Sequence, residues 1–321
     1  MKFVTAEHNG TRFPGLQTET HVIDLNRLPL SRTFADLNDF IANHSVNDLA
    51  ALNAETGPTS LGRPQRHAEL PAKSASEQPG SAAEHMAAAS AFPLEDVRVL
   101  APITKPVHDI LCVGLNYQKH IEESGTMLKR QGDIPKHLSY FSKRAHIVLG
   151  HGDRLALDAD LDNALDYEVE LAVVIGKEGK NIKAEDALDY VFGYTILNDF
   201  SARTIQAQHG QWFRGKSLDG YTAIGPVIVH RSSLPHPLSL SLSLSVNGEV
   251  RQSSTTDYMI KGVAELIEEL SSGMTLVPGD IIATGTPEGV GMGFDPPRYL
   301  QPGDRVECLI DGIGALENYI V

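Results

Sequence analysis

The stretch that decides the fold is Asp166-Tyr167-Glu168-Val169-Glu170-Leu171-Ala172-Val173-Val174-Ile175-Gly176. Its apolar, β-branched run ended by glycine predicts a buried strand. Side chains two positions apart in a strand point to the same face, so Glu168 and Glu170 would hold two carboxylates close together. Burial makes their repulsion worse, and a divalent cation would relieve it. The alternative is an acidic strand edge exposed to solvent, but the apolar residues that continue the strand favour burial.

A third acidic residue ends another apolar stretch, residues 195–199. At the end of such a strand, the side chain of Asp199 can reach a site at the edge of the sheet. Three carboxylates without a histidine or a cysteine suit a hard cation. Glu168, Glu170 and Asp199 therefore predict a site for Mg²⁺ or Mn²⁺, ahead of Ca²⁺, with water or substrate completing the octahedral coordination.

Outside these stretches, the chain is rich in strand patterns and poor in long helices. Residues 238–246 alternate leucine and serine, and Asn247-Gly248 predicts that this strand turns back as a hairpin. The one clear helical pattern is 260–270, with its apolar side chains on one face. We therefore expect a mostly β domain of the α+β class, built of wrapped sheets.

The chain also predicts a division into parts. Residues 56–91 are rich in alanine, serine, proline and glycine, which is typical of a linker. We expect residues 1–65 to form a small N-terminal α+β module, residues 66–94 a linker, and residues 95–321 the catalytic domain.

Composition excludes some classes of partner. The 321 residues are 41% hydrophobic, enough for a sizeable core, and the net charge of −14 argues against a nucleic-acid surface. A local basic pocket could still bind an anionic substrate. No apolar run approaches the length of a membrane span, and the first residues lack the apolar segment of a signal peptide. We expect a cytoplasmic protein with no membrane partner.

A histidine and a glutamate three residues apart follow the first strand of the main domain. In a helical turn, His120 and Glu123 lie on one face. A carboxylate beside an imidazole orients the ring and raises its basicity, which predicts a base that works near neutral pH. The alternative is an ordinary surface pair.

Several long motifs, in the same order along the chain, resemble the fumarylacetoacetate hydrolase family. They are DYEVELAVVIG at 166–176, GYTILNDFSAR at 193–203, RGKSLD at 214–219 and PGDIIATGTPEGVG at 278–291. The resemblance covers roughly residues 100–321 and is closest to the smaller bacterial-type members. It implies a β-roll of wrapped mixed sheets, a homodimer, and Mg²⁺ or Mn²⁺ on the three carboxylates.

The resemblance also implies roles for further residues. His120 and Glu123 match a His-x-x-Glu catalytic dyad, and residues 124–135 fit the mobile lid that often follows it. Lys216 matches a catalytic lysine, and Lys143 a second lysine near the substrate carboxylate. Gln206 matches a glutamine that hydrogen-bonds substrate.

A glycine turn in the last motif is a further candidate. Thr284-Gly285-Thr286 offers hydroxyls and backbone N–H groups that could cradle a substrate carboxylate. The alternative is an ordinary tight turn. The chain departs from the family pattern at Thr204 and Arg144, and Arg144 would affect which distal group of the substrate is accepted.

The implied substrate is a small anionic 2-oxo acid. We expect hydrolysis of a C–C bond in a 2,4-dioxo acid of the acylpyruvate or fumarylpyruvate type, through an enolate stabilised by the metal, because His120 and Glu123 would activate water. Decarboxylation of oxaloacetate and isomerisation of a 2-hydroxydienoate are alternatives, since both pass through the same kind of enolate. A non-catalytic small-molecule-binding protein is a second alternative.

Overall fold

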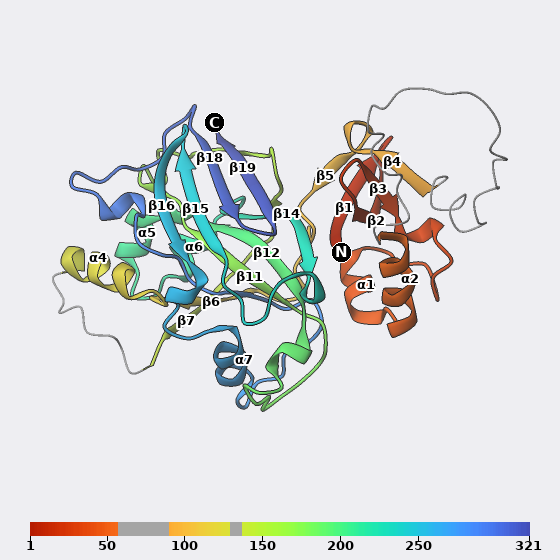
Figure 1. The fold of residues 1–321 in the computed structure, drawn as a ribbon. Helices are drawn as coiled ribbons and strands as arrows, with labels where there is room; N and C mark the ends of the chain where they lie inside the picture. Colours follow the sequence, from red (N-terminus) through yellow and green to blue (C-terminus); the bar gives the residue numbers. More distant parts are fainter. Residues whose placement is uncertain (57–89, 129–136) are drawn as a thin grey trace, which may run out of the picture.

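The computed structural model describes residues 1–56, 90–128 and 137–321. Its largest sheet has twelve strands, ten of them in one hydrogen-bonded order (Figure 1). That order is β4 (Ala91–Pro93), β3 (His21–Asp24), β2 (Thr11–Gln17), β1 (Lys2–His8), β14 (Thr222–His230), β12 (Val191–Asp199), β11 (Val169–Ile175), β17 (Ile281–Ala283), β6 (Ile110–Gly114) and β7 (Ser139–Lys143). The other two strands pair at its sides: β5 (Arg98–Leu100) with β1, and β8 (Val148–Leu149) with β14.

A second sheet packs over the first (Figure 1). Its order is β16 (Glu249–Thr255), β15 (Ser241–Val246), β18 (Arg305–Ile310), β19 (Gly314–Ile320) and β9 (Arg154–Leu155). A short pair joins β10 (Leu165–Asp166) to β13 (Ser201–Ala202). The predicted hairpin between β15 and β16 is confirmed, because Asn247 and Gly248 both have positive φ, as a two-residue hairpin turn of this type requires.

Helices are few and short. They are α1 (Leu37–Asn43), α2 (Val46–Thr56), α4 (Gln118–Leu128), α5 (Arg203–Gln208), α6 (Phe213–Lys216) and α7 (Val263–Ser271), with 3₁₀ turns η1 (Leu25–Arg27), η2 (Leu94–Asp96), η3 (Ala187–Tyr190), η4 (Arg231–Ser233), η5 (Thr256–Tyr258) and η6 (Gly291–Gly293). The helix predicted at 260–270 is α7, which begins at Val263 because Gly262 is its N-cap and donates its N–H to Glu265. The expected fold class, mostly β with a few helices, is confirmed. None of the described helices is long and apolar enough to cross a membrane.

Strand β11 lies at the centre of the large sheet, between β12 and β17. Every one of its residues is buried. Leu171 and Val173 pack into one hydrophobic cluster, whereas Ala172 and Val174 pack into another on the opposite face. Both faces of the strand are therefore covered, which explains why its apolar run is nearly continuous.

The N-terminal residues extend the same sheet. Strand β1 pairs with β14, so that Phe3 lies opposite Ile228. The Phe3 ring contacts the rings of Phe40 in α1 and Phe192 in β12, with centroids 5.2 Å and 5.1 Å away. The N-terminal strands and helices thus share a core with the main sheet. Residues 66–89 of the predicted linker lie outside the described residues, and the domain limits stay a prediction.

Candidate functional site

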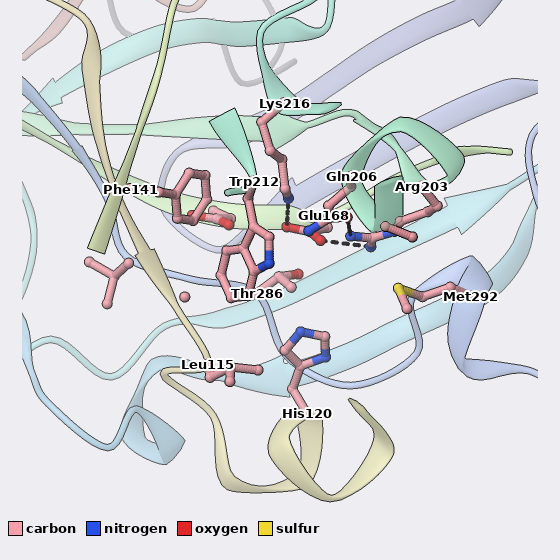
Figure 2. Close-up of a pocket in the computed structure, with 14 residues that line it drawn as sticks. Leu115, His120, Phe141, Glu168, Arg203, Gln206, Trp212, Lys216, Thr286 and Met292 are labelled. Carbon is pink, nitrogen blue, oxygen red and sulfur yellow. Dashed lines mark hydrogen bonds and ion pairs between the residues drawn. The ribbon is translucent and has the colours of Figure 1, made fainter. Parts of the chain in front are cut away.

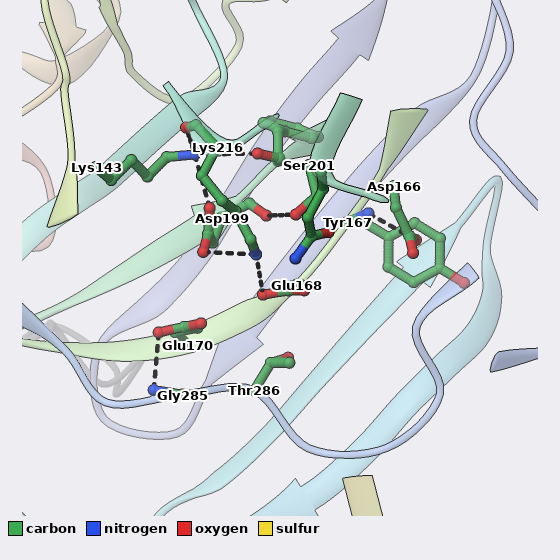
Figure 3. A network of polar contacts seen from close by, with 12 residues as sticks. Lys143, Asp166, Tyr167, Glu168, Glu170, Asp199, Ser201, Lys216, Gly285 and Thr286 are labelled. Atoms are coloured by element: carbon green, nitrogen blue, oxygen red, sulfur yellow. Dashed lines mark hydrogen bonds and ion pairs between the residues drawn. The ribbon is translucent and has the colours of Figure 1, made fainter. Parts of the chain in front are cut away.

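Three buried carboxylates meet at adjoining ends of β11 and β12. Glu168 immediately precedes β11, Glu170 is its second residue, and Asp199 is the last residue of β12. The antiparallel register sets Val169 opposite Asn198, and the Asp199 N–H donates to the Glu168 carbonyl oxygen at 2.9 Å. One oxygen from each carboxylate lies within 4.8 Å of the others (Figure 3).

Buried cations surround two of these carboxylates. The Lys216 ammonium lies 2.7 Å from Glu168 Oε2 and 2.8 Å from Asp199 Oδ2, bridging them (Figure 3). Arg203 Nη2 lies 2.7 Å from Glu168 Oε1. Lys143 Nζ lies 2.6 Å from Asp199 Oδ1. Burial favours the neutral form of Glu168, but the charges of Lys216 and Arg203 outweigh it and lower the pKa of Glu168 to about 2.

Glu170 has a different environment. Its Oε2 accepts the N–H of Gly285 at 2.8 Å, and no lysine or arginine in the described part of the chain forms an ion pair with it. Burial raises the pKa of Glu170 well above its ordinary value, and the negative charges of Asp199 and Glu168 raise it further. The cluster therefore holds one carboxylate whose negative charge lacks a paired cation.

This arrangement fits a divalent cation. The available donors are all carboxylate oxygens, the set preferred by Mg²⁺ and Mn²⁺. A cation held there would compensate the charge of Glu170, which the protein itself does not. Glu168, Glu170 and Asp199 are the residues that would bind it.

The histidine and glutamate predicted as a dyad lie on α4 and face each other. His120 Nδ1 is 3.1 Å from Glu123 Oε2, and both side chains are largely buried. The other oxygen of Glu123 accepts the N–H of Gly289 at 3.0 Å. A Cβ on Gly293 would overlap Glu123 Oε1, so the carboxylate is seated against a backbone that only glycine allows.

A cavity of about 150 Å³ joins the carboxylates to the dyad (Figure 2). One part of its wall is polar and another is apolar. It is lined by Val113, Gly114, Leu115, His120, Phe141, Glu168, Glu170, Arg203, Gln206, Ala207, Trp212, Lys216, Thr286 and Met292.

Two of the five predicted substrate residues, Gln206 and Thr286, line this cavity, whereas Lys143, Thr284 and Gly285 do not. Lys143 is completely buried and lies against Asp199, where its ammonium also donates to the backbone carbonyls of Phe200 and Lys216. Gln206 lines the cavity with its Oε1 already accepting from Arg203 at 3.0 Å, which leaves its NH₂ group to donate.

Residues 284–286, predicted to cradle a substrate carboxylate, instead form hydrogen bonds with β11. The Gly285 N–H is taken by Glu170, and the Thr284 hydroxyl donates to the Leu171 carbonyl at 2.8 Å. Thr286 lines the cavity, and its hydroxyl donates to the Val169 carbonyl at 3.0 Å. In the predicted lid, residues 129–135 and the side chains of 124–128 lie outside the described part of the structure.

Three residues of the site, Asp166, Arg203 and Trp212, had no role predicted from the sequence. Arg203 ties Glu168 to Asp166, whose carboxylate lies 2.8 Å from Arg203 Nε and also accepts the N–H groups of Gly291 and Met292. A signal for Arg203 was present, since it follows the predicted ligand Asp199 by four residues. Trp212 has no such local signal, because it reaches the cavity only through the path of the chain around α6.

Comparisons with known proteins identify the family of this chain. The family described as fumarylacetoacetate (FAA) hydrolase, C-terminal, matches residues 109–321. The oxaloacetate tautomerase YisK of Bacillus subtilis (strain 168) is 51% identical over 229 residues, which are 71% of this chain and 75% of that protein. The solved fumarylacetoacetate hydrolase of Exiguobacterium antarcticum is 36% identical, with a TM-score of 0.74 over 100% of this chain and 99% of that one.

A third similar protein is the 2-hydroxyhepta-2,4-diene-1,7-dioate isomerase of Mycobacterium marinum. It is 29% identical, with a TM-score of 0.68 over 100% of this chain and 98% of that one. The names of these relatives include a tautomerase, a hydrolase and an isomerase, so they agree on the fold and differ in the reaction. The resemblance seen in the motifs is confirmed: the chain belongs to the fumarylacetoacetate hydrolase family.

Proposed function

We propose that this chain is a divalent-metal-dependent enzyme that interconverts the keto and enol forms of oxaloacetate. The observation that carries the proposal is one small cavity lined both by Glu168 and Glu170 of the carboxylate cluster and by His120, which contacts Glu123. The choice among the family's reactions follows the 51% identity to a protein named oxaloacetate tautomerase.

The reaction needs an acidified C–H bond and a group that moves its proton. A divalent cation held by Glu168, Glu170 and Asp199 would polarise the 2-oxo group of the substrate and acidify the adjacent carbon. His120 lines the same cavity, and Glu123 beside it fixes the orientation of the imidazole ring. His120 would therefore take a proton from carbon 3 and return it to oxygen, or the reverse.

The cations of the site would hold the anionic substrate. Arg203 uses three of its five N–H groups on Asp166, Glu168 and Gln206, which leaves two for a substrate carboxylate. The ammonium of Lys216 likewise has a third N–H beyond those given to Glu168 and Asp199. Both side chains line the cavity.

The test follows the ultraviolet absorbance of enol-oxaloacetate as the enol converts to the keto form. Metal-free protein, protein with Mn²⁺ or Mg²⁺, and metal alone are compared at equal concentrations. We expect conversion above the metal-only rate, lost in His120→Asn and kept in Lys119→Gln, an exposed neighbour on α4. A wild-type rate equal to the metal-only rate would refute the proposal.

Hydrolysis of an acylpyruvate is the second candidate function. The His120–Glu123 pair favours it, because the same base could activate water for attack on a 4-oxo group. Incubation with acetylpyruvate and with oxaloacetate, followed by measurement of pyruvate, separates the possibilities. Pyruvate and acetate from acetylpyruvate indicate a hydrolase, pyruvate and carbon dioxide from oxaloacetate indicate a decarboxylase, and faster loss of the enol without pyruvate indicates a tautomerase.

A further inference from the structure

The cavity wall also contains two aromatic rings, and the Lys216 ammonium lies over one of them, that of Phe141, at 5.6 Å from its centroid. Trp212 and Phe141 both line the cavity, and their rings meet edge to face with centroids 5.3 Å apart (Figure 2). Trp212 immediately precedes α6, and its carbonyl oxygen accepts the N–H of Lys216 at 3.1 Å. The indole is thus attached to the same turn that presents the bridging lysine to the carboxylates.

The indole of Trp212 occupies space that is free because residue 114 is a glycine. A Cβ on Gly114, the last residue of β6, would overlap indole carbon Cζ3 and lie 2.9 Å from Cη2. The indole therefore rests directly on the Gly114 backbone. This surface carries no charge of its own, because Gly114 has no side chain and the indole of Trp212 is neutral.

We propose that Trp212 is a specificity-determining residue that limits the length of the substrate beyond its 2-oxo acid head. This inference rests on the proposed function to the extent that the head binds at the carboxylate cluster. The head would be received by the cation that Glu168, Glu170 and Asp199 hold and by the basic side chains of Lys216 and Arg203. The distal group must then occupy the remaining space, where the indole forms part of the wall.

The size of the cavity supports a limit on length. A cavity of about 150 Å³ can hold a molecule of the size of benzene, which suits a compact four-carbon acid. A longer chain would need the space that the indole fills. Removal of the indole should admit that chain and let it gain about fourfold in affinity for each methylene that becomes buried.

The experiment measures binding of N-alkyl oxamates, unreactive molecules that carry a carboxylate beside a carbonyl. Calorimetric titrations with Mn²⁺ present compare N-methyl oxamate with N-butyl oxamate. Wild-type protein should bind the butyl compound at least tenfold more weakly than the methyl compound. Trp212→Ala should reverse this order, and Trp212→Leu should lie between the two. Phe213→Ala, at the adjacent and exposed position, should keep the wild-type preference.

A double-mutant cycle tests whether the position of the Trp212 indole depends on Gly114. Gly114→Ala should change the preference in the wild-type background, because its methyl group displaces the indole, but it should have little further effect beside Trp212→Ala. Melting curves of each variant show that it is folded.

Different results would overturn the role of Trp212 and the proposed function. An unchanged methyl-to-butyl ratio in folded Trp212→Ala and Trp212→Leu would overturn the inference while leaving the 2-oxo acid site intact. If the wild-type protein bound Mn²⁺ but neither oxamate, the proposed function would fall, and this inference with it.

Discussion

Replacement of Glu170 by glutamine should stabilise the metal-free protein and at the same time weaken its binding of Mn²⁺. Glu170 is buried against two other carboxylates, and its one hydrogen bond within the described residues comes from the Gly285 N–H. Glutamine has nearly the same shape and can still accept that hydrogen bond. The substitution therefore removes a charge that the folded protein compensates poorly, and it also removes one of the three oxygen ligands.

The substitution should raise the folding stability of the metal-free protein and lower its affinity for Mn²⁺. Replacing poorly compensated buried charge by a neutral group of similar volume stabilises proteins by roughly 1–4 kcal/mol. Loss of a ligand should weaken Mn²⁺ binding by about 100-fold or more, at least as much as loss of a group that only supports a ligand. Glu168→Gln is the matched control, since it leaves Lys216 and Arg203 without their shared partner. That variant should lose about 3–5 kcal/mol.

The stabilisation of Glu170→Gln should grow with pH. Because the pKa of Glu170 is raised by folding, the folded protein holds its proton more tightly than the unfolded chain does. The metal-free wild type therefore loses stability as the pH rises above the ordinary value of 4.5 towards the raised value. The glutamine variant lacks this group and avoids the loss.

Thermal unfolding in a chelator, with and without added Mn²⁺, measures both effects. We expect a higher Tm for Glu170→Gln than for the wild type in chelator, and a much smaller rise on addition of Mn²⁺. Calorimetric titration gives the metal affinity directly. If Glu170→Gln and Glu168→Gln were destabilised equally in chelator, the distinction drawn between the two carboxylates would be wrong.

Further predictions concern Lys216, the His120–Glu123 dyad, the glycine that Glu123 packs against, and the pH dependence of metal binding. Lys216→Met should destabilise the metal-free protein by about 3–5 kcal/mol in denaturant unfolding, because two carboxylates lose their bridging ammonium; an unchanged midpoint would contradict this. His120→Gln should lower turnover by about 10²–10⁴-fold and leave the calorimetric Mn²⁺ affinity nearly unchanged, since His120 is not among the three candidate ligands; a large loss of affinity would place it in the metal site. Gly293→Ala should lower turnover to the level of Glu123→Ala, and the two changes should not add in the double variant, because the new methyl group displaces the same carboxylate. Mn²⁺ affinity of the wild type should rise with pH, as Glu170 must lose its proton to bind the ion, and a flat pH profile in calorimetry would argue against that coupling.

Local sequence patterns were enough to predict much of the site. The two-residue period of a strand placed Glu168 and Glu170 on one face, and the structure brings both to Asp199. The helical spacing of His120 and Glu123 likewise corresponds to a contact within α4. These inferences needed only the geometry of one element, which a short sequence window contains.

The role of each basic residue depended on contacts between distant segments. Lys143 reads in the sequence as a substrate lysine, yet it lies against Asp199 because β7 ends behind the carboxylate cluster. Trp212 meets Gly114 across about a hundred positions of the chain. No local period encodes such a contact.

The sequence by itself determined the family, the mostly β class and the residue types that suit a divalent cation, because these follow from motifs and from the periods of single strands and helices. Only the tertiary structure decided which carboxylate lacks a cation, which lysine reaches the cavity and how far the cavity extends. Those properties arise from the pairing of β11 with β12 and β17 and from the packing of α6 against β7, where charge, burial and close contact depend on segments far apart in the chain.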